Sequence, residues 1–455
     1  MIARTFAAAL LATALAAPAH AQDKADAIAA ELAAMRARIA ELESQVAALK
    51  AQPAPVAAPA ATTAAAAAAP PVTAGAKPKE SGSPSIKLFG RLQYDAAHVG
   101  RPAGLDDRGL GFSHELRRGR IGAEGSIAGG FGYKVEVDFA DNQVELTDVY
   151  LSYKASKQLG LTLGQHNNFQ SLEELTSSRF LSFMERAAFT DAFGFERRLG
   201  FSGTLTRSDL IAQAGVFTDN IEDLSNAGGA SAGVGDENDA VGFDARLVYA
   251  PRLGGSQFHL GASAHWRDNN DLATFGPSTR YRQRPFVHST DTRFISTPAL
   301  RVGEETGYGL EAAWIRGPLH ATGEVHWLRA DTLTAGTSPT FFGGYAEIGY
   351  HLTGETRGYK GGRWDRTKVL KPVRGGGLGA LQINLRFDHL DLSGDGVIGG
   401  TQRGYAASLV WILQDHVRLL LNYARLRVED AAIVPPSGDR DYGVNVVGAR
   451  AQVDF

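Results

Sequence analysis

Short segments that alternate apolar and polar residues recur along the chain from residue 85 to its end. In the segment Phe131–Phe139 every second residue is apolar or aromatic, and the residues between include Lys134, Glu136 and Asp138. Successive side chains of a β-strand point to opposite faces, so each segment would form a strand with one apolar and one charged face. No helix or second sheet is predicted to cover the apolar faces, so we expect them to contact lipid. The pattern predicts a transmembrane β-barrel with a wet, charged interior.

Sixteen segments of this kind are present, and an even number is what a single-chain bacterial barrel with both ends in the periplasm requires. The predicted fold class is all-β, a 16-stranded antiparallel transmembrane β-barrel over residues 85–455, with an N-terminal α-helical coiled coil. The expected strands are 85–99, 112–127, 131–140, 144–153, 159–167, 197–206, 209–218, 241–250, 257–267, 305–316, 318–329, 340–351, 379–390, 403–413, 416–427 and 443–455.

The links between these strands differ in length. If the first strand runs outward, short links such as 206–209 fall on the periplasmic side, and the long links at 168–196, 219–240 and 268–304 fall outside. The link 352–378 breaks this rule, because it is long and lies on the periplasmic side. Links of this length inside a compact domain are usually functional.

The region before residue 85 has a different composition. Arg4, the apolar run that follows it and the small residues before position 22 predict a secretory signal peptide at residues 1–21. Residues 51–84 are rich in Ala, Pro and Thr and predict a linker that does not fold. No other run reaches the roughly 18 apolar residues that a membrane-spanning helix needs, which leaves a closed barrel as the way to cross a membrane.

Residues 22–50 repeat apolar residues at alternating spacings of four and three, which predicts a periplasmic coiled coil. Glu31 with Arg36, and Arg38 with Glu43, are pairs of opposite charge at the spacing used between parallel helices. An isolated amphipathic helix is the alternative, because about three heptads is short. The β-branched residues of the seam favour a dimer, whereas a porin would suggest a trimer, and the sequence leaves this conflict open.

Composition excludes several classes of function. The formal net charge of −3 is too small to indicate a nucleic-acid partner, and the absence of cysteine excludes disulfides, thiolate metal sites and cysteine nucleophiles. The segment Gly200–Thr204 lacks the final glycine of a nucleophile elbow, and His114-Glu115 lacks the second histidine of a zinc motif. We therefore expect no catalytic residue, no metal site, no cofactor and no enzymatic activity.

The link 168–196 carries two helix signals. Ser171–Glu174 and Ser182–Glu185 each fit the spacing of a capping box, which predicts two short helices. An ordered loop of this length can fold inward and narrow the lumen, which would place Arg179 and Arg186 near a constriction. The alternative is a loop that caps the outer rim.

Basic residues are concentrated in two long links and on the charged faces of the strands. Residues 351–377 contain seven basic and two acidic residues, and residues 277–301 contain five arginines and one aspartate. In a low-dielectric channel such groups attract anions, and arginine can hold phosphate in a bidentate manner. The alternative is that they pair with carboxylates or with lipopolysaccharide phosphates at the rim. The candidate channel-lining, anion-binding residues are Arg118, Arg120, Arg179, Arg186, Arg198, Arg246, Arg363, Arg366, Lys368 and Lys371.

Four places in the chain carry a family likeness: residues 89–96 (FGRLQYDA), 116–125 (LRRGRIGAEG), 171–178 (SLEELTSS) with 183–186 (FMER), and 351–355 (HLTGE). With these motifs the chain resembles the phosphate-selective porins O and P of bacterial outer membranes. The resemblance implies a 16-stranded barrel, a homotrimer and passive diffusion of anions past lumenal arginines. It adds Arg117 to the lumenal set, and it suggests that the link 352–378 folds into the channel beside the third loop.

The sequence therefore predicts a bacterial outer-membrane porin, with its N-terminal segment in the periplasm, that passes small anions such as phosphate or polyphosphate. The expected partners are these anions, outer-membrane lipid and lipopolysaccharide, two further copies of the chain, and peptidoglycan through the coiled coil. One alternative is a general, weakly selective porin. A second alternative is a structural tether between the outer membrane and peptidoglycan.

Overall fold

The computed structural model describes residues 84–455, except 141–142, 222–239, 270–277 and 335. The predicted signal peptide (1–21), the predicted coiled coil (22–50) and nearly all of the predicted linker (51–84) lie outside the described residues.

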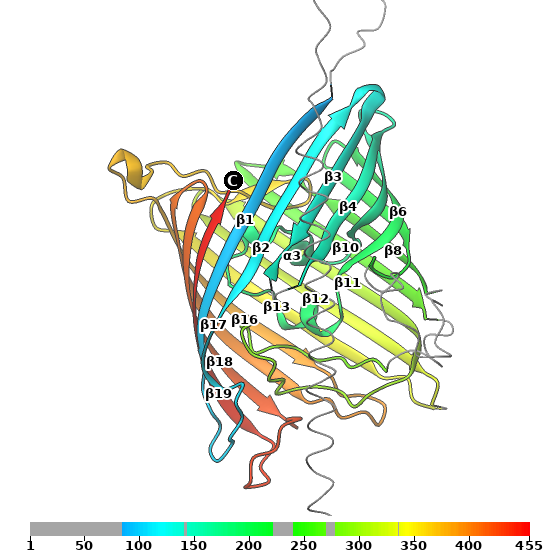
Figure 1. The fold of residues 1–455 in the computed structure, drawn as a ribbon, viewed down its shortest axis with the longest axis vertical. Coiled ribbons are helices and arrows are strands. Elements are labelled where there is room, and N and C mark those ends of the chain that lie inside the picture. The colour runs from blue at the N-terminus through cyan, green and yellow to red at the C-terminus, as the bar shows by residue number, and fades with distance from the viewer. Residues whose placement is uncertain (1–83, 141–142, 222–239, 270–277, 335) are drawn as a thin grey trace, which may run out of the picture. The chain divides into compact units, whose positions relative to one another are not determined.

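Sixteen antiparallel strands pair in chain order, and β1 also pairs with β19, which closes the sheet into a barrel (Figure 1). The two-residue strand β9 (Arg252–Leu253) belongs to the turn between β8 and β10. The wall consists of β1 (Ser85–Val99), β2 (Gly111–Ile127), β3 (Phe131–Asp138), β4 (Glu145–Lys154), β5 (Leu159–Asn167), β6 (Arg197–Arg207), β7 (Leu210–Phe217), β8 (Val241–Tyr249), β10 (Ser256–Asp268), β11 (Val302–Arg316), β12 (Leu319–Thr332), β13 (Thr340–His351), β16 (Ala380–Asp391), β17 (Thr401–Gln414), β18 (Val417–Glu429) and β19 (Tyr442–Asp454).

The predicted 16-stranded antiparallel barrel is confirmed. The largest shifts in strand ends are at β11, which begins at Val302 rather than residue 305, and at β12, which ends at Thr332 rather than residue 329. With the exception of the link between β13 and β16, the long described loops lie at one end of the barrel and the short turns at the other. The end with the long loops is the extracellular end by the usual asymmetry of outer-membrane barrels.

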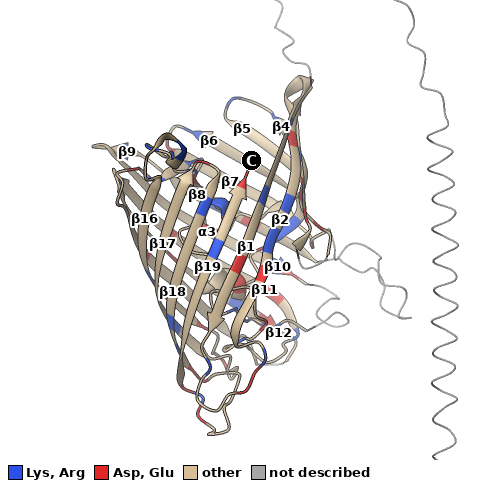
Figure 2. Cartoon of the chain, turned by 60° about the vertical axis from the view of Figure 1, so that its left-hand side comes forward, with Lys and Arg blue, Asp and Glu red and all other residues tan. Residues whose placement is uncertain are grey.

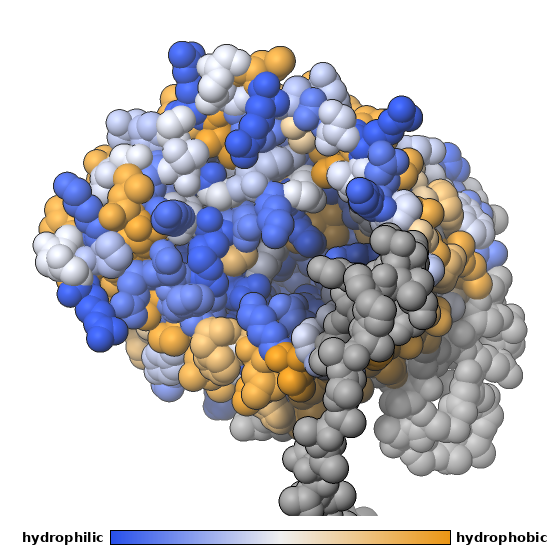
Figure 3. Space-filling view, turned by 90° about the horizontal axis from the view of Figure 1, so that it is seen from above, coloured by the Kyte–Doolittle hydropathy of each residue, from blue (hydrophilic) through white to orange (hydrophobic). Residues whose placement is uncertain are grey.

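Each strand presents an apolar face outward and a polar face to the lumen. In β18, Leu419, Leu421 and Tyr423 are exposed on the outside, whereas Arg418 and Asn422 are buried inside. Viewed along the barrel from the end where the chain terminates, hydrophilic side chains gather over the middle and hydrophobic ones around the outside (Figure 3). The alternation that predicted the strands is thus the division between lipid and lumen.

A β-bulge interrupts this alternation in β2. Gln93 of β1 is opposite Arg118, but the next residue, Tyr94, is opposite Leu116, so Arg117 is the extra residue. A bulge shifts the alternation by one position, and here it turns the consecutive side chains of Arg117 and Arg118 to the same side of the wall. The bulge therefore adds one inward arginine that strict alternation would point at the lipid.

The wall has two stretches of different height. The six consecutive strands β3 to β8 contain 8 to 11 residues each, whereas the other ten contain 12 to 17. Because a strand rises about 3.3 Å per residue, β3 to β8 form a lower arc of the barrel.

Short helical elements occur in the links: α3 (Leu172–Leu175), α4 (Ala188–Ala192) and single 3-10 turns at Ala128–Gly130, Ser178–Phe180 and Val373–Gly375. A two-stranded hairpin, β14 (Gly358–Lys360) and β15 (Arg363–Asp365), lies in the link after β13. None of the helices in the described part of the chain is long and apolar enough to cross a membrane.

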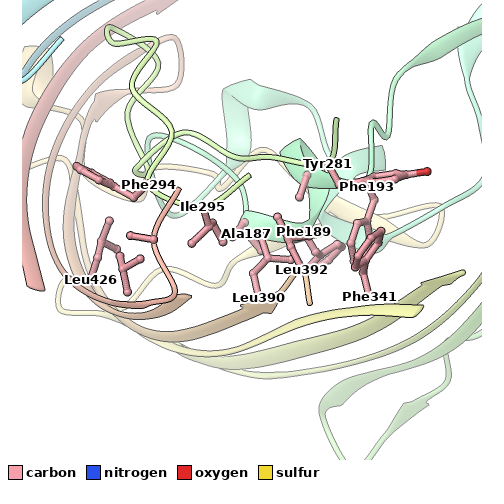
Figure 4. Close-up of a cluster of buried hydrophobic side chains, with 14 of the residues drawn as sticks. Ala187, Phe189, Phe193, Tyr281, Phe294, Ile295, Phe341, Leu390, Leu392 and Leu426 are labelled. Carbon is pink, nitrogen blue, oxygen red and sulfur yellow. The ribbon is translucent and has the colours of Figure 1, made fainter. Parts of the chain in front are cut away.

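An apolar core lies inside the extracellular half of the barrel (Figure 4). It is built by Phe189 from the link after β5, by Phe294 and Ile295 from the link after β10, and by wall residues such as Leu390 and Leu426. All five side chains are at most 1% exposed. Burial of this kind stabilises the folded loops in the same way as a soluble core, so these loops fill part of the lumen rather than extend into the medium.

We predict that Leu310→Arg lowers the free energy of unfolding of the barrel in a bilayer by roughly 2–4 kcal/mol, because Leu310 lies at the middle of β11 and faces lipid. The matched control is Leu333→Arg, which follows the end of β12 and is equally exposed at 54%. Urea unfolding of the barrel in liposomes, followed by the heat-dependent migration of the folded form on gels, measures both variants. Equal losses in the two variants would contradict a lipid-facing position for Leu310.

Candidate channel constriction

The link 168–196, called the inward loop below, lies across the lumen and begins with helix α3. The side chain of Ser171 accepts a hydrogen bond from the backbone N–H of Glu174 at 3.1 Å, as the capping-box spacing predicts. The carboxylate of Glu324, from β12, accepts two further hydrogen bonds from the N–H groups of Leu172 and Glu173 at 2.9 and 2.8 Å. The N-terminus of α3 is thus held by its own cap and by the barrel wall.

The second predicted helix is displaced. Residues 182–185 form no helix, and α4 instead begins at Ala188. The side chains that suggested a capping box are engaged elsewhere: Ser182 accepts a hydrogen bond from Arg357, and Glu185 pairs with Arg117 at 2.9 Å. Contacts with the link 352–378 and with the wall therefore replace the local cap that the sequence pattern indicated.

Wall arginines hold the backbone of the inward loop. Arg418 donates hydrogen bonds to the carbonyl oxygens of Arg179 and Leu181, and Arg450 donates to that of Met184 at 2.5 Å. The alternation in β18 and β19 places Arg418 and Arg450 on the lumenal face, so strict period-two counting could have identified both as lumenal. Their role as anchors depends on where the loop folds, which the sequence does not specify.

Two buried wall arginines, Arg386 and Arg450, also form ion pairs with the inward loop. Arg386 of β16 pairs with Glu347 at 2.6 Å and with Glu173 of the inward loop. Arg450 pairs with Asp95 and with Glu185 of the loop, both at 2.7 Å. Figure 2 shows acidic and basic segments side by side on β1, β2 and β19.

The pKa values of the loop carboxyls follow their surroundings. Burial raises the pKa of Glu173 and of Glu174. Burial acts in the same direction on Glu185, but the nearby guanidinium groups of Arg117 and Arg450 outweigh it and hold the pKa of Glu185 well below its usual range. Glu185 is therefore a fixed negative charge between two arginines.

The link 352–378, called the inserted link below, enters the lumen from the periplasmic end. Its Trp364 is 2% exposed and packs with Leu172 of the inward loop and with Ile315 of β11. The guanidinium of Arg357 lies 4.1 Å from the Trp364 ring centroid. Arg246 of β8 donates a 2.8 Å hydrogen bond to the carbonyl of a glycine in the hairpin turn, so the link reaches the wall four strands away from β13.

The basic residues of the inserted link divide into two groups. Arg363, in the hairpin, is exposed, and so is Lys368, which is next to the buried Val369. Arg366 pairs with Asp454 at the periplasmic end of β19. Lys371 lies beside the turn Val373–Gly375, which extends away from the barrel mouth (Figure 1). Lys371 is therefore placed outside the lumen.

Open space remains along one arc of the wall. A cavity of about 290 Å³ is lined by Arg117, Glu174 and Arg186, among others, and a second of about 380 Å³ is lined by Glu124 and Lys134, among others. Arg117 and Glu124 lie seven positions apart on the inward side of β2, and Arg118 and Arg120 lie between them. In contrast, the inward side chains of β16 and β18 are buried under the loops. Both cavities are thus off-centre, next to β2, and the arc from β2 to β6 is the candidate path for solutes.

Ion pairs line this path, and in most of them the cation is the more exposed partner. Lys134 (19%) and Arg197 (25%) both pair with Asp148 (10%), at 2.5 and 2.6 Å. Arg186 (18%) pairs with Glu174 (8%) at 3.2 Å. The Arg198–Glu196 pair has the opposite order, and Arg117 and Glu185 are equally exposed. Water in the lumen therefore meets more positive than negative surface here.

The other predicted residues are placed as follows. Arg120 is buried and pairs with Glu136 and Asp138, and Arg246 is buried and pairs with Glu311. Arg118 donates to the side-chain oxygen of Gln93 at 2.9 Å and has no carboxylate partner in the described part of the structure.

Arg179 and Arg366 come from different links but share Asp454, at the periplasmic end of the barrel. Sequence reasoning missed Lys134 and Arg197 as members of the path. Lys134 had an alternation signal in β3. Arg197 is next to Arg198 at the start of β6, so alternation assigned Arg198 to the lumenal face and Arg197 to the opposite face.

A closed 16-stranded barrel whose lumen is narrowed by an inward loop defines the porin class of outer-membrane proteins. The family model for phosphate-selective porin O and P matches residues 86–455, and the chain belongs to this family. This family membership indicates the bacterial outer membrane as the location.

Two curated relatives are similar over most of the chain. An uncharacterized protein of Caulobacter vibrioides is 52% identical over 375 residues, which cover 82% of this chain and 75% of the relative. Porin O of Pseudomonas aeruginosa is 25% identical over 396 residues, which cover 78% of this chain and 86% of the relative.

Solved structures share the fold. An anion-selective porin from Comamonas acidovorans matches with a TM-score of 0.52 at 14% identity, covering 82% of this chain and 100% of that chain. A loop-deletion mutant of OmpT from Vibrio cholerae matches with a TM-score of 0.51 at 11% identity and the same coverage. At these identities the likeness concerns the fold alone.

We predict that Arg450→Met releases the inward loop, because the substitution leaves Asp95 as an unpaired buried carboxylate and Glu185 with Arg117 as its remaining partner. An unpaired buried charge costs roughly 3–5 kcal/mol. Single-channel recording should give a larger and noisier conductance than the parent channel. The matched control is Arg316→Met, an exposed arginine at the periplasmic end of β11, which should leave the conductance unchanged. Folding of both variants is verified by heat-dependent gel migration, and a folded Arg450→Met channel with parental conductance would contradict the anchoring role.

Proposed function

We propose that this porin prefers small anions, with phosphate or polyphosphate as substrates, and that they diffuse passively along the β2 to β6 arc of the barrel. The observation that carries the proposal is the orientation of the ion pairs on this arc. Lys134, Arg186 and Arg197 are each more exposed than the carboxylates that neutralise them. An anion in the path therefore contacts cationic groups directly, while the carboxylates lie farther from it.

Three further observations support anion preference. Arg118 has no carboxylate partner in the described residues and lies between the two cavities. Arg363 and Lys368 are exposed on the inserted link and add positive charge at the periplasmic mouth. The family carries phosphate selectivity in its description, and the fold is shared with a porin described as anion-selective. We leave Lys371 out of the proposed path because of its position outside the lumen.

The reversal potential of the full-length channel in a salt gradient tests the proposal. We expect anion preference in potassium chloride and a reduction of chloride current when phosphate is added, since phosphate presents more acceptor oxygens to the same arginines. A cation-selective channel would contradict the proposal. Anion preference without any effect of phosphate would leave a general, weakly selective porin in its place.

Charge variants of the arc locate the preference. Replacing Lys134 and Arg197 by glutamine should lower the anion-to-cation permeability ratio roughly threefold or more, because one unit charge about 6 Å from an ion changes its energy by about 0.7 kcal/mol in water. Asp148→Asn removes the carboxylate between them and should raise the ratio instead. Lys134→Arg keeps the charge and serves as the control. If neither the double variant nor Asp148→Asn changed the permeability ratio from its parental value, the assignment of these residues to the path would be wrong.

The proposal includes a homotrimer. The low arc of β3 to β8 suits contact with neighbouring copies, whereas the ten taller strands suit contact with lipid. Native mass spectrometry of the detergent-extracted chain should give three times the protomer mass. A monomer at concentrations at which the channel conducts would rule out the trimer.

A further inference from the structure

Three arginines lie on the lipid-facing side of the barrel at its extracellular end. Arg403 of β17 is directly opposite Arg427 of β18, and Arg425 of β18 is opposite Tyr405. On both strands these arginines continue the outward row, which includes Leu409 and Leu421 farther along the wall. Figure 2 shows basic colour on the part of β18 toward the extracellular loops. We call these three residues the arginine patch.

The arginine patch has more positive charge than its neighbours neutralise. Arg403 pairs with Glu429 at 2.6 Å. Arg425 donates to the side-chain oxygen of Asn445 at 3.1 Å, and Arg427 lies 5.9 Å from the ring centroid of Tyr405. Neither Arg425 nor Arg427 has a carboxylate partner in the described structure. Like charges directly opposite each other on adjacent strands are destabilising, so an external anion would stabilise this arrangement.

The local backbone makes room for this arrangement. Gly443 of β19 is the residue opposite Arg427, and a Cβ atom at Gly443 would lie 2.1 Å from a terminal nitrogen of Arg425. The Arg425 side chain therefore crosses β19 at Gly443, where no side chain obstructs it. Its guanidinium is spread along the outer surface of the wall.

An apolar groove of about 590 Å³ begins next to the arginine patch on the same outer surface. It extends over β13, β16, β17, β18 and β19 and is lined by residues that include Leu385, Ala407, Leu421 and Tyr423. Almost all of its accessible surface is apolar. Tyr423 joins the two features, because its ring lines the groove and its hydroxyl group donates to the same Asn445 oxygen that Arg425 contacts, at 3.1 Å.

An unsatisfied cationic cluster directly above an apolar groove matches a lipid with an acidic headgroup. We propose that the arginine patch and the groove together bind one lipopolysaccharide molecule of the outer leaflet, with headgroup phosphates or carboxylates on Arg425 and Arg427 and an acyl chain in the groove. The patch lies at the extracellular end, where the outer leaflet is, and guanidinium groups bind phosphate and carboxylate in bidentate fashion.

The surroundings favour a lipid over a second copy of the chain. The patch is flanked by Phe387, Tyr405 and Tyr423, which are exposed aromatic residues of the kind that lie at membrane interfaces. The strands involved, β16 to β19, belong to the taller part of the wall. This inference concerns the outside of the barrel and is independent of which solute passes through it.

Binding of purified, fluorescently labelled lipopolysaccharide to the delipidated full-length protein in detergent tests the proposal. Replacing Arg425 and Arg427 together by glutamine should raise the Kd roughly 30-fold, since each interfacial arginine contributes about fivefold. Ala407→Trp fills the groove without changing any charge and should raise the Kd about tenfold or more, because a buried acyl chain loses several methylene contacts. Heat-dependent gel migration verifies that each variant is folded.

Arg329→Gln is the matched control, because Arg329 is also an outward, exposed arginine near the extracellular end, on β12, away from the groove. Its Kd should stay within about twofold of the parent value, since one distant charge alters only general attraction. An unchanged Kd in the Arg425 and Arg427 variant, an equal loss in the control, or equally tight binding of phosphatidylglycerol would each overturn the proposal.

The absence of native cysteine allows a direct test of the competing occupant. Tyr405→Cys in the outer membrane should not form a disulfide with a second copy. Near-complete crosslinking would assign the patch to a protein interface and overturn the lipid site.

Discussion

The ion pairs that join the inward loop to the barrel wall are the interaction on which the shape of this channel depends. Arg386 lies between Glu173 and Glu347, and Arg450 lies between Asp95 and Glu185, with almost no access to water for either arginine. A buried charge that loses its partner is strongly unfavourable. If the loop moved away from the wall, Arg386 and Arg450 would each lose a carboxylate partner while remaining buried. It behaves as part of the wall, and the path for solutes is fixed by what the loop and the inserted link leave open.

The strands were predictable from the sequence because one physical rule acts on all of them. A closed barrel between lipid and water requires alternating side chains at every level, and the chain from β1 to β19 follows that requirement. Where the rule is broken, alternation alone cannot succeed. The extra residue Arg117 in β2 reverses the phase of the strand, and only the likeness to a family placed it inside. Alternation also could not show that Ser182 and Glu185 would contact the inserted link and the wall rather than cap a helix.

The candidate site was less predictable, since its meaning depends on partners that are distant in the sequence. Counting charges found Arg120 and Arg246, but not that Glu136 and Glu311 neutralise them. The expectation that the link 352–378 enters the channel came from resemblance, and its residues contact the inward loop and the wall at β8. Lys371 carries the same charge as Lys368 but lies on a turn directed elsewhere. Relative exposure within a pair, which distinguishes Lys134 from Asp148, is a property of the folded molecule alone.

The off-centre position of the open path divides the barrel into two sectors with different tolerance to sequence change. On the β16 to β18 side, an inward residue such as Asn422 or Arg418 is buried under a loop, so most replacements there disturb the architecture. On the sector from β2 to β6, inward side chains such as Tyr150 and Thr162 are partly exposed. Evolution, or an engineer, can therefore retune the solutes that cross this membrane by altering a small arc of one protein while its scaffold stays intact.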